Sequence, residues 1–209
     1  MSYKNKKKEV AYFIRRLYAQ KLTTCLGGNI SFKADDNNVL ITPSQLDKAI
    51  LKSNQIGVVT IEGENLTPKY KLSMETGMHL SIYKKRKDVK AIIHAHSTFA
   101  TSFAAMQKDI NNNLTGETRA IIGNIVAAPY ALMGSEELAK IVSDKSVDAN
   151  VILMENHGII AFGNTLLEAF NRIEVLESAA KMTIVTELMK SKKELSDKDL
   201  NVLDHFLDD

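Results

Sequence analysis

The stretch Val-Lys-Ala-Ile-Ile-His-Ala-His, residues 89–96, decides how the rest of the chain is interpreted. Its apolar, β-branched first half is typical of a buried strand. His94 and His96 are spaced i, i+2, so both imidazoles leave the same face of the pleat. Their Cα atoms would lie roughly 6.5 Å apart, which lets two tilted imidazoles reach one metal ion at about 2.0–2.1 Å. Since a histidine beside an apolar strand is often only a hydrogen-bonded core residue, the metal interpretation depends on a third ligand.

Hydrophobic periodicity elsewhere predicts a mixture of helices and strands. Apolar residues spaced i, i+3, i+4 indicate amphipathic helices, and short β-branched runs indicate strands. Helices are predicted at residues 6–21, 73–83, 97–106, 136–142, 165–189 and 197–207, and strands at residues 30–32, 38–41, 55–60, 89–96, 121–128, 150–154 and 159–162. We expect Ser73 to cap its helix and Glu177 to lie on the exposed side of the long helix. The pattern is that of an α/β protein.

Length and composition narrow the class of protein. The chain has 209 residues, so residues 1–209 are expected to form a single domain. Hydrophobic residues make up 44%, and no apolar run approaches the roughly 20 residues that cross a bilayer. No apolar signal segment follows the basic start, so we expect a cytoplasmic protein without a membrane partner. The net charge is only +2, and the lysine clusters at residues 6–8 and 84–87 are more typical of solvated faces than of nucleic-acid binding.

A third histidine, His157, follows another predicted buried strand in an Asn-His-Gly turn. Three neutral imidazoles leave a divalent ion with an open position, which is typical of catalytic zinc sites, whereas structural sites are usually closed by four ligands and often contain cysteine. Cys25 is the single cysteine and is expected to be an inert thiol. His205 is expected at the surface. We therefore predict a catalytic metal site at His94, His96 and His157.

A carboxylate and several hydroxyls are further candidates for this site. Glu75, about twenty residues before the histidine pair, has two interpretations: an ordinary acid in the first turn of a helix, or a carboxylate folded back onto the metal. His79, one turn later, is either a packed residue or a partner that orients Glu75. The glycine-rich loop before Asn29 is an ordinary turn signal, but together with Ser44 and Ser73 it can form a pocket for an anion. A metal beside an anion pocket fits a sugar phosphate.

Six separated motifs occur in the chain: Gly28-Asn29-Ile30-Ser31, Ile41-Thr42-Pro43-Ser44, Ser73-Met74-Glu75, His94-Ala95-His96, Ala128-Pro129-Tyr130 and Asn156-His157-Gly158. In this order and with these gaps they resemble the class II aldolase/adducin family, and within it the branch of fuculose-1-phosphate aldolases. The resemblance covers nearly the whole chain. It implies a three-layer α/β/α domain with a central mixed, mostly antiparallel sheet. It also implies a homotetramer with active sites at subunit interfaces.

The resemblance assigns roles position by position. It implies that the three histidines hold a divalent metal, with Zn²⁺ expected first and Mn²⁺ or Co²⁺ as alternatives. Asn29, Ser44 and Ser73 match phosphate-binding positions, and Glu75 matches the carboxylate that moves the proton. The implied reaction cleaves a deoxyketose 1-phosphate, either L-fuculose 1-phosphate or a shorter one such as 5-deoxyribulose 1-phosphate, into dihydroxyacetone phosphate and an aldehyde.

The chain also departs from the pattern of that branch. Met74 stands where a second phosphate-binding serine is expected, and the tyrosines that handle the aldehyde end have no match. Glu117 lies in the corresponding region and either takes over a proton role or is a surface residue. A catalytic Glu117 would favour the alternative of a methylthioribulose-1-phosphate dehydratase. A sugar-phosphate epimerase, which would carry an aspartate in place of Glu75, and a non-catalytic adducin-like domain, which would lack the histidines, are further alternatives.

Overall fold

The computed structural model describes residues 3–206 and contains one seven-stranded sheet in the order β3-β2-β1-β4-β7-β6-β5. Every neighbouring pair is antiparallel except β5 and β6, which run parallel. The strands are β1 (Asn29–Lys33), β2 (Asn38–Ile41), β3 (Gly57–Thr60), β4 (Ala91–Ala95), β5 (Ile125–Ala128), β6 (Val151–Met154) and β7 (Gly158–Gly163). This confirms the expected α/β fold with a mixed, mostly antiparallel sheet. Residues 91–95 of the predicted strand 89–96 form β4, the central strand of the sheet.

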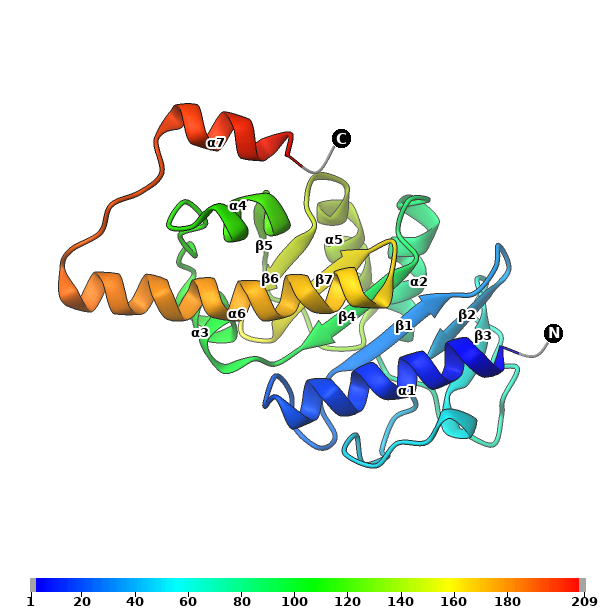
Figure 1. Ribbon diagram of the computed structural model, residues 1–209. Helices are drawn as coiled ribbons and strands as arrows, with labels where there is room; N and C mark the ends of the chain where they lie inside the picture. Colours follow the sequence, from blue (N-terminus) through cyan, green and yellow to red (C-terminus); the bar gives the residue numbers. More distant parts are fainter. Residues whose placement is uncertain (1–2, 207–209) are drawn as a thin grey trace.

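Helices cover both faces of the sheet (Figure 1). On one face, α1 (Lys4–Ala19), α3 (Thr98–Met106) and α6 (Leu166–Met189) share a hydrophobic core with the strands. On the other face, α2 (Thr76–Lys85) and α5 (Glu136–Lys145) enclose a second core. Strand β4 supplies both, since Ile93 lies in the first core and Ile92 in the second. His94 therefore takes the side of Ile92, toward α2 and α5.

The region before β5 differs from the prediction of one strand over residues 121–128. Residues Gly116–Ile122 form the helix α4, and the strand begins only at Ile125. The side chain of Thr115 accepts a hydrogen bond from the backbone of Thr118 at 3.2 Å, so it caps the helix start. Gly123 then ends the helix with a φ of +63°, a conformation that glycine adopts readily. The alternating apolar residues of this short segment therefore belong partly to a helix face.

The remaining elements are short or lie at the end of the chain. Two 3₁₀ turns, η1 (Ser53–Gln55) and η2 (Ser146–Asp148), precede β3 and β6, and α7 (Asp197–Asp204) packs against α4 beyond the end of α6. The predicted last helix over residues 197–207 is thus shorter, and residue 207 lies outside the described residues. Within residues 3–206, no helix is both long enough and apolar enough to cross a bilayer.

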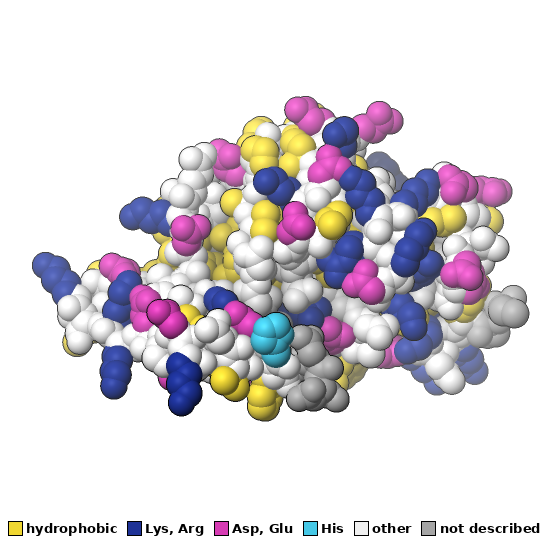
Figure 2. Space-filling model, turned by 90° about the horizontal axis from the view of Figure 1, so that it is seen from above, with side chains coloured by type: hydrophobic (Ala, Val, Ile, Leu, Met, Phe, Trp, Pro, Cys, Tyr) yellow, Lys and Arg dark blue, Asp and Glu magenta, His cyan; other side chains and the backbone are white. Residues whose placement is uncertain are grey.

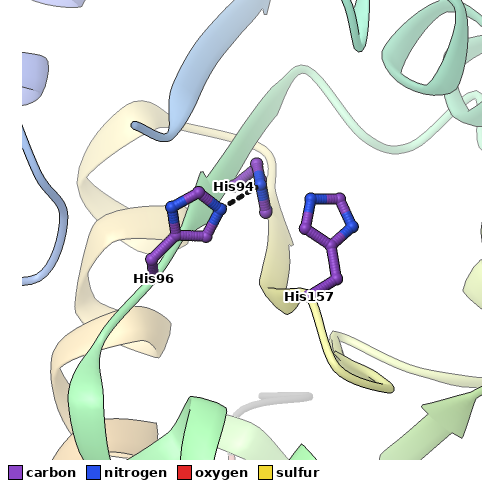
Figure 3. Close-up of side chains that lie close together, drawn as sticks. All are labelled: His94, His96 and His157. Atoms are coloured by element: carbon purple, nitrogen blue, oxygen red, sulfur yellow. Dashed lines mark hydrogen bonds between the residues drawn. The ribbon is translucent and has the colours of Figure 1, made fainter. Parts of the chain in front are cut away.

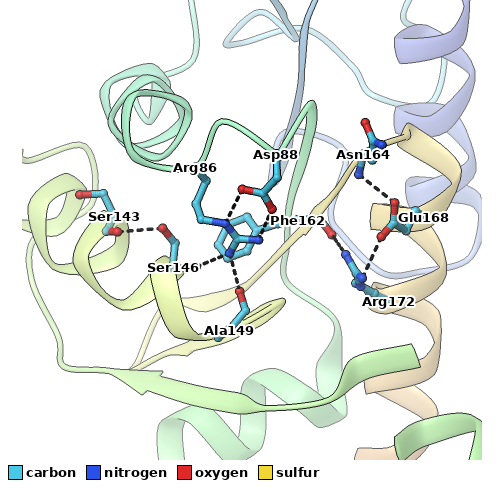
Figure 4. A network of polar contacts seen from close by, with 9 residues as sticks. All are labelled: Arg86, Asp88, Ser143, Ser146, Ala149, Phe162, Asn164, Glu168 and Arg172. Atoms are coloured by element: carbon cyan, nitrogen blue, oxygen red, sulfur yellow. Dashed lines mark hydrogen bonds and ion pairs between the residues drawn. The ribbon is translucent and has the colours of Figure 1, made fainter. Parts of the chain in front are cut away.

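Two half-buried arginines join the elements at one end of β4 and β7 (Figure 4). Arg86 donates to the carbonyls of Ser146 and Ala149 and forms two hydrogen bonds with Asp88. Arg172 donates to the carbonyl of Phe162 at 2.6 Å and of Ile121 at 3.2 Å, and pairs with Glu168. These contacts fix α2, η2, β7 and α6 together. The histidines lie at the opposite end of the same two strands.

Charges are mixed on the face seen from above in Figure 2, where basic and acidic side chains alternate over the surface. In the predicted lysine cluster 84–87, Lys84 pairs with Glu62 at 2.9 Å and Lys85 pairs with Asp144. Acidic partners thus lie beside these lysines, as expected of a solvated face.

Candidate metal centre

The three histidines predicted as ligands come together at the end of β4 (Figure 3). His94 lies within β4 and is fully buried, while His96 follows the strand by one residue. His157 comes from the turn between β6 and β7, where Asn156 has a φ of +51°. The ring of His94 has its centroid 4.6 Å from that of His96 and 4.8 Å from that of His157, and one nitrogen of each ring lies within 4.8 Å of the others. Three imidazoles, two from the end of β4 and one from the β6–β7 turn, thus face one small volume.

The protonation of these rings suits a metal ion. The Nδ1 of His94 is 2.9 Å from the carbonyl oxygen of Ile159, which can only accept, so this nitrogen carries the proton and Nε2 keeps its lone pair. Burial lowers the pKa of His94, and burial together with the charge of His94 lowers the pKa of His96 to about 3. The two Nε2 atoms are 2.9 Å apart. Neutral imidazoles with converging lone pairs are the state that binds a cation, so the donor set fits a divalent metal.

Glu75 lies directly against the histidines. Its side chain is buried, with Oε2 3.1 Å from Nε2 of His94 and Oε1 3.0 Å from Nε2 of His157. Asn29 donates to Oε2 of Glu75 at 2.7 Å. Burial acts to raise the pKa of Glu75, but the adjacent His94 and His157 side chains and the hydrogen bond from Asn29 lower it by more, so the pKa lies below its ordinary value. Glu75 thus occupies the second of its two predicted positions, that of a carboxylate folded back onto the histidines.

The three residues predicted to bind phosphate lie on segments that adjoin Glu75. The bridge between Pro43 and Leu72 joins the segments of Ser44 and Ser73, and the backbone N–H of Ser44 donates to Lys71 at 2.9 Å. The hydroxyl of Ser73 accepts from the N–H of Glu75 at 3.3 Å. Ser73 is not the helix cap that the sequence predicted, because α2 begins at Thr76 and Glu75 occupies the cap position without a side-chain cap bond. The amide of Asn29 points at Glu75, with its Oδ1 buried and unpaired.

Two glycines allow the loops to approach the histidines. Gly28 has a φ of +64°, and a Cβ there would lie 2.8 Å from the carbonyl oxygen of His94. A Cβ on Gly158 would lie 2.6 Å from Cδ2 of His96. Any side chain at either position would therefore displace the strand end or a ring. The glycine of the Asn-His-Gly turn and the second glycine before Asn29 are required by this packing.

Other candidate residues lie away from the cluster. Glu117 is exposed in the first turn of α4, which packs on α6 and α7. His79 is buried, and its Nδ1 bonds to the hydroxyl of Ser31 at 2.7 Å. Among the described residues no hydrogen bond joins the His79 ring to Glu75. Of the two roles predicted for His79, the structure therefore favours the packed residue over the partner of Glu75. His205 and Cys25 are exposed, as expected.

Glu177 lies elsewhere than its sequence pattern predicts. It was expected on the exposed side of the long helix, but it is only 5% exposed and accepts the backbone N–H groups of Phe99 at 3.1 Å and Ala100 at 2.9 Å. These are the first turns of α3, which begins directly after His96. The carboxylate satisfies N–H groups that a helix start leaves free. Glu177 lies four residues after the buried Ile173, so the two residues share one face of the helix. This spacing could have predicted that Glu177 is buried.

A mixed sheet between two helical layers, with three histidines converging at the end of its central strand, defines a metal-binding α/β protein. Residues 8–184 match the family model described as Class II Aldolase and Adducin N-terminal domain, so the chain belongs to this family. The resemblance inferred from the six motifs is thereby confirmed. The metal that the cluster prefers is not determined by three imidazoles alone.

Relatives in the family carry more than one activity. The chain is 35% identical over 184 residues to an L-fuculose phosphate aldolase of Methanocaldococcus jannaschii, covering 88% of this chain and 98% of the relative. It is 34% identical over 172 residues to a 3-oxo-tetronate 4-phosphate decarboxylase of Haemophilus influenzae, covering 80% and 81%. A solved structure of an L-fuculose 1-phosphate aldolase superimposes with a TM-score of 0.91 at 31% identity, covering 100% of this chain and 99% of that chain.

Proposed function

We propose that the protein is a metal-dependent aldolase that cleaves a deoxyketose 1-phosphate, such as L-fuculose 1-phosphate or 5-deoxyribulose 1-phosphate, to dihydroxyacetone phosphate and an aldehyde. The observation that carries this proposal is the buried carboxylate of Glu75, within 3.0–3.1 Å of two of three converging imidazoles. Carbon–carbon cleavage beside a carbonyl requires both an electron-withdrawing ion and a group that moves a proton to carbon. The site offers both.

His94, His96 and His157 would hold the ion, with Zn²⁺ expected first and Mn²⁺ or Co²⁺ as alternatives. A divalent ion there would supply a Lewis acid that withdraws electrons from the ketose carbonyl. Cleavage breaks the C3–C4 bond, the C4 hydroxyl loses its proton and becomes the aldehyde, and the electron pair on C3 conjugates with C2. Glu75 takes up the proton that the C4 hydroxyl loses and delivers it to C3 in this direction, and the transfer runs in reverse in the direction of synthesis. The product is dihydroxyacetone phosphate.

Asn29 donates to the carboxylate of Glu75 at 2.7 Å and so helps to hold it in place. We assign the hydroxyls of Ser44 and Ser73 and the second N–H of the Asn29 amide to the substrate phosphate, since only one N–H of that amide is used by Glu75. Several hydrogen bonds to a dianion hold one end of the substrate and leave the reacting carbons at Glu75. Met74, which is 61% exposed beside Ser73, leaves one hydroxyl fewer for that phosphate.

A decarboxylase is the second candidate, favoured by the relative that carries this activity. A 3-oxo-tetronate 4-phosphate that loses carbon dioxide leaves an electron pair on the carbon next to the ketone. Protonation of that carbon gives dihydroxyacetone phosphate as well. The two reactions therefore share their second half, and Glu75 would protonate the same kind of carbon in both. They differ only in whether an aldehyde or carbon dioxide leaves.

The dehydratase alternative rests on Glu117, which lies on α4 and not at the histidines of its own chain. A catalytic role for Glu117 would need a neighbouring subunit, as in the homotetramer with interfacial active sites that we also propose. The epimerase would need another residue in place of Glu75. The adducin-like alternative predicts loss of histidines that are present. A single domain, a cytoplasmic location, and the absence of membrane and nucleic-acid partners remain predictions.

The test is a panel of ketose 1-phosphates and 3-oxo-tetronate 4-phosphate, each supplied to protein loaded with Zn²⁺, Mn²⁺ or Co²⁺. Dihydroxyacetone phosphate is measured by an enzyme-coupled assay, and aldehyde and carbon dioxide are measured separately. We expect dihydroxyacetone phosphate and aldehyde in equal amounts. Release of carbon dioxide without aldehyde would exclude the aldolase and support the decarboxylase. A dehydrated product without dihydroxyacetone phosphate would exclude both and support the dehydratase.

A further inference from the structure

Lys48 is an unusual residue of this structure because its charge is buried without a counter-charge. It is 1% exposed, and its Nζ donates to the carbonyl of Pro43 at 2.7 Å. An ammonium group has three N–H donors, yet within residues 3–206 this carbonyl is its only hydrogen-bond partner, and no carboxylate forms an ion pair with it. Lysine is almost never fully buried unless it is paired. The free protein therefore carries an uncompensated positive charge at this point.

Burial acts on this group as expected for an isolated cation. It lowers the pKa of Lys48 to about 8, which still leaves most of the side chains protonated at pH 7. An apolar residue of similar length would avoid the cost of burying the charge. A charge kept at such a cost is more typical of a binding site than of a hydrophobic core.

The surroundings of Lys48 connect it to the segments assigned to the phosphate. Pro43, which accepts its hydrogen bond, directly precedes Ser44 and pairs with Leu72, the residue before Ser73. The backbone N–H of Lys48 donates to the carbonyl of Cys25 at 2.8 Å, in the loop that leads to Asn29. The backbone of Lys48 is thus held to the loop before β1, and its ammonium group is held to the carbonyl of Pro43, the residue before Ser44.

We propose that Lys48 is the fixed cation of the phosphate site, and that its charge is neutralised by the phosphate of the substrate when this binds at Ser44. The inference rests on the proposed function, because it takes Ser44 as a phosphate-binding residue. The ammonium group of Lys48 holds the Pro43 carbonyl and attracts the phosphate electrostatically without contacting it. Lys48 is therefore a positioning residue for the dianion. In a low-dielectric region such an attraction is much stronger than at the surface.

Two variants separate the charge from the hydrogen bond. Lys48→Gln keeps a donor for the Pro43 carbonyl and removes the charge, whereas Lys48→Met removes both and suits a buried position. The matched control is Lys52→Met, which removes one charge from an exposed lysine four residues later. Binding of inorganic phosphate to the metal-loaded protein is measured by calorimetry, together with the melting temperature with and without phosphate.

We expect both Lys48 variants to bind phosphate roughly tenfold or more weakly, and Lys52→Met to bind it as the unmodified protein does. The melting temperature of Lys48→Met without phosphate should be unchanged or higher, because a buried charge is gone, while the increase caused by phosphate should shrink. With a ketose 1-phosphate substrate, KM should rise and kcat should change little. A purely structural lysine would instead lower the melting temperature and leave the phosphate affinity of the folded variant unchanged.

Unchanged phosphate affinity in either folded Lys48 variant would overturn the inference and leave the aldolase proposal intact. An equal loss in Lys52→Met would also overturn it, because any nearby charge would then suffice. If the unmodified metal-loaded protein binds no phosphate, the phosphate site assigned under the proposed function fails, and this inference fails with it.

Discussion

The two ends of the strand pair β4 and β7 carry two polar clusters that differ in how fully they are paired. At one end, every guanidinium nitrogen of Arg86 and Arg172 has a carbonyl or carboxylate partner (Figure 4). At the other end, around the histidines of Figure 3, Oδ1 of Asn29 and Nδ1 of His157 are buried and have no hydrogen-bond partner among residues 3–206. Native proteins rarely leave buried polar atoms unpaired.

This difference distinguishes a cluster that stabilises the fold from a cluster that serves function, at two ends of one sheet. The arginine cluster is complete in the protein alone, so it can contribute its full stabilisation to the fold. The histidine cluster has convergent lone pairs, a carboxylate with a lowered pKa and polar atoms left unpaired within the described residues, which are features of a functional site. Changes at the first cluster should therefore affect stability, and changes at the second should affect chemistry.

The largest effect is expected for His96→Ala. Loss of one of three imidazoles should abolish bound metal and bring activity to the assay background, while the protein still folds. Metal content is measured by mass spectrometry on the purified variant, and activity by release of dihydroxyacetone phosphate. His205→Ala, on the exposed end of α7, is the control and should keep both. Stoichiometric metal in His96→Ala would remove the histidine cluster as the metal site.

Glu75→Gln should have the next largest effect. The amide still offers an oxygen to Asn29, so the site keeps its shape and its metal, but it cannot carry the proton. We expect turnover to fall roughly a hundredfold or more, as for loss of a general acid or base. Metal content and kcat are measured on the same preparation. Near-normal turnover would exclude Glu75 from proton transfer.

Arg86→Met tests the other end of the strand pair. It leaves the carbonyls of Ser146 and Ala149 without their donor, and we expect a loss of about 2–4 kcal/mol in the free energy of unfolding, since a buried unsatisfied group costs about 1–3 kcal/mol. Urea denaturation measures this loss, with Lys87→Met as the exposed control. The folded variant should keep its kcat and metal. A selective loss of kcat without a loss of stability would contradict the separation of the two ends.

The smallest effect is expected for Gln45→Gly, next to Ser44. Gln45 is exposed with a φ of +60°, a left-handed conformation that costs a non-glycine residue about 1–2 kcal/mol. Part of this gain is offset by the freer unfolded chain, so we expect stabilisation of about 0.5–1 kcal/mol. Lys190→Gly, at a φ of +50° after α6, should give the same gain far from the site. Only Gln45→Gly should raise KM for the phosphorylated substrate. A raised KM in both variants, or in neither, would show that the turn at Gln45 has no specific role in phosphate binding.

The features predicted correctly from the sequence are those that short-range patterns specify. Strand β4 and the i, i+2 spacing of His94 and His96 follow from the pleat, and the motif order was enough to identify the family. The position of Glu75 beside the histidines was one of two interpretations until the fold placed the start of α2 against β4. Spacing alone cannot decide such a contact between distant segments.

The features that were missed depend on tertiary neighbours. Lys48 stands between Asp47 and Ala49 in a polar segment, a context that predicts a solvated lysine, and only the approach of two loops buries it. Glu177 looked like one more exposed charge until α3 placed its helix start against it. The last two residues of α4, Ile121 and Ile122, were predicted as the start of a strand, because a short apolar run fits both periods.

The position of β4 in the sheet determines when the metal centre can form. His94 pairs with Asn29 on one side and with Ile160 on the other, so neither neighbour of this strand is close to it along the chain. Pairing over such long loops is slow, because the entropy of closing them is lost before the contacts form. A chain leaving the ribosome thus has no complete metal centre until β7 has been synthesised. Metal uptake should therefore be among the last steps of folding, and its rate should follow the formation of the β4–β7 pair.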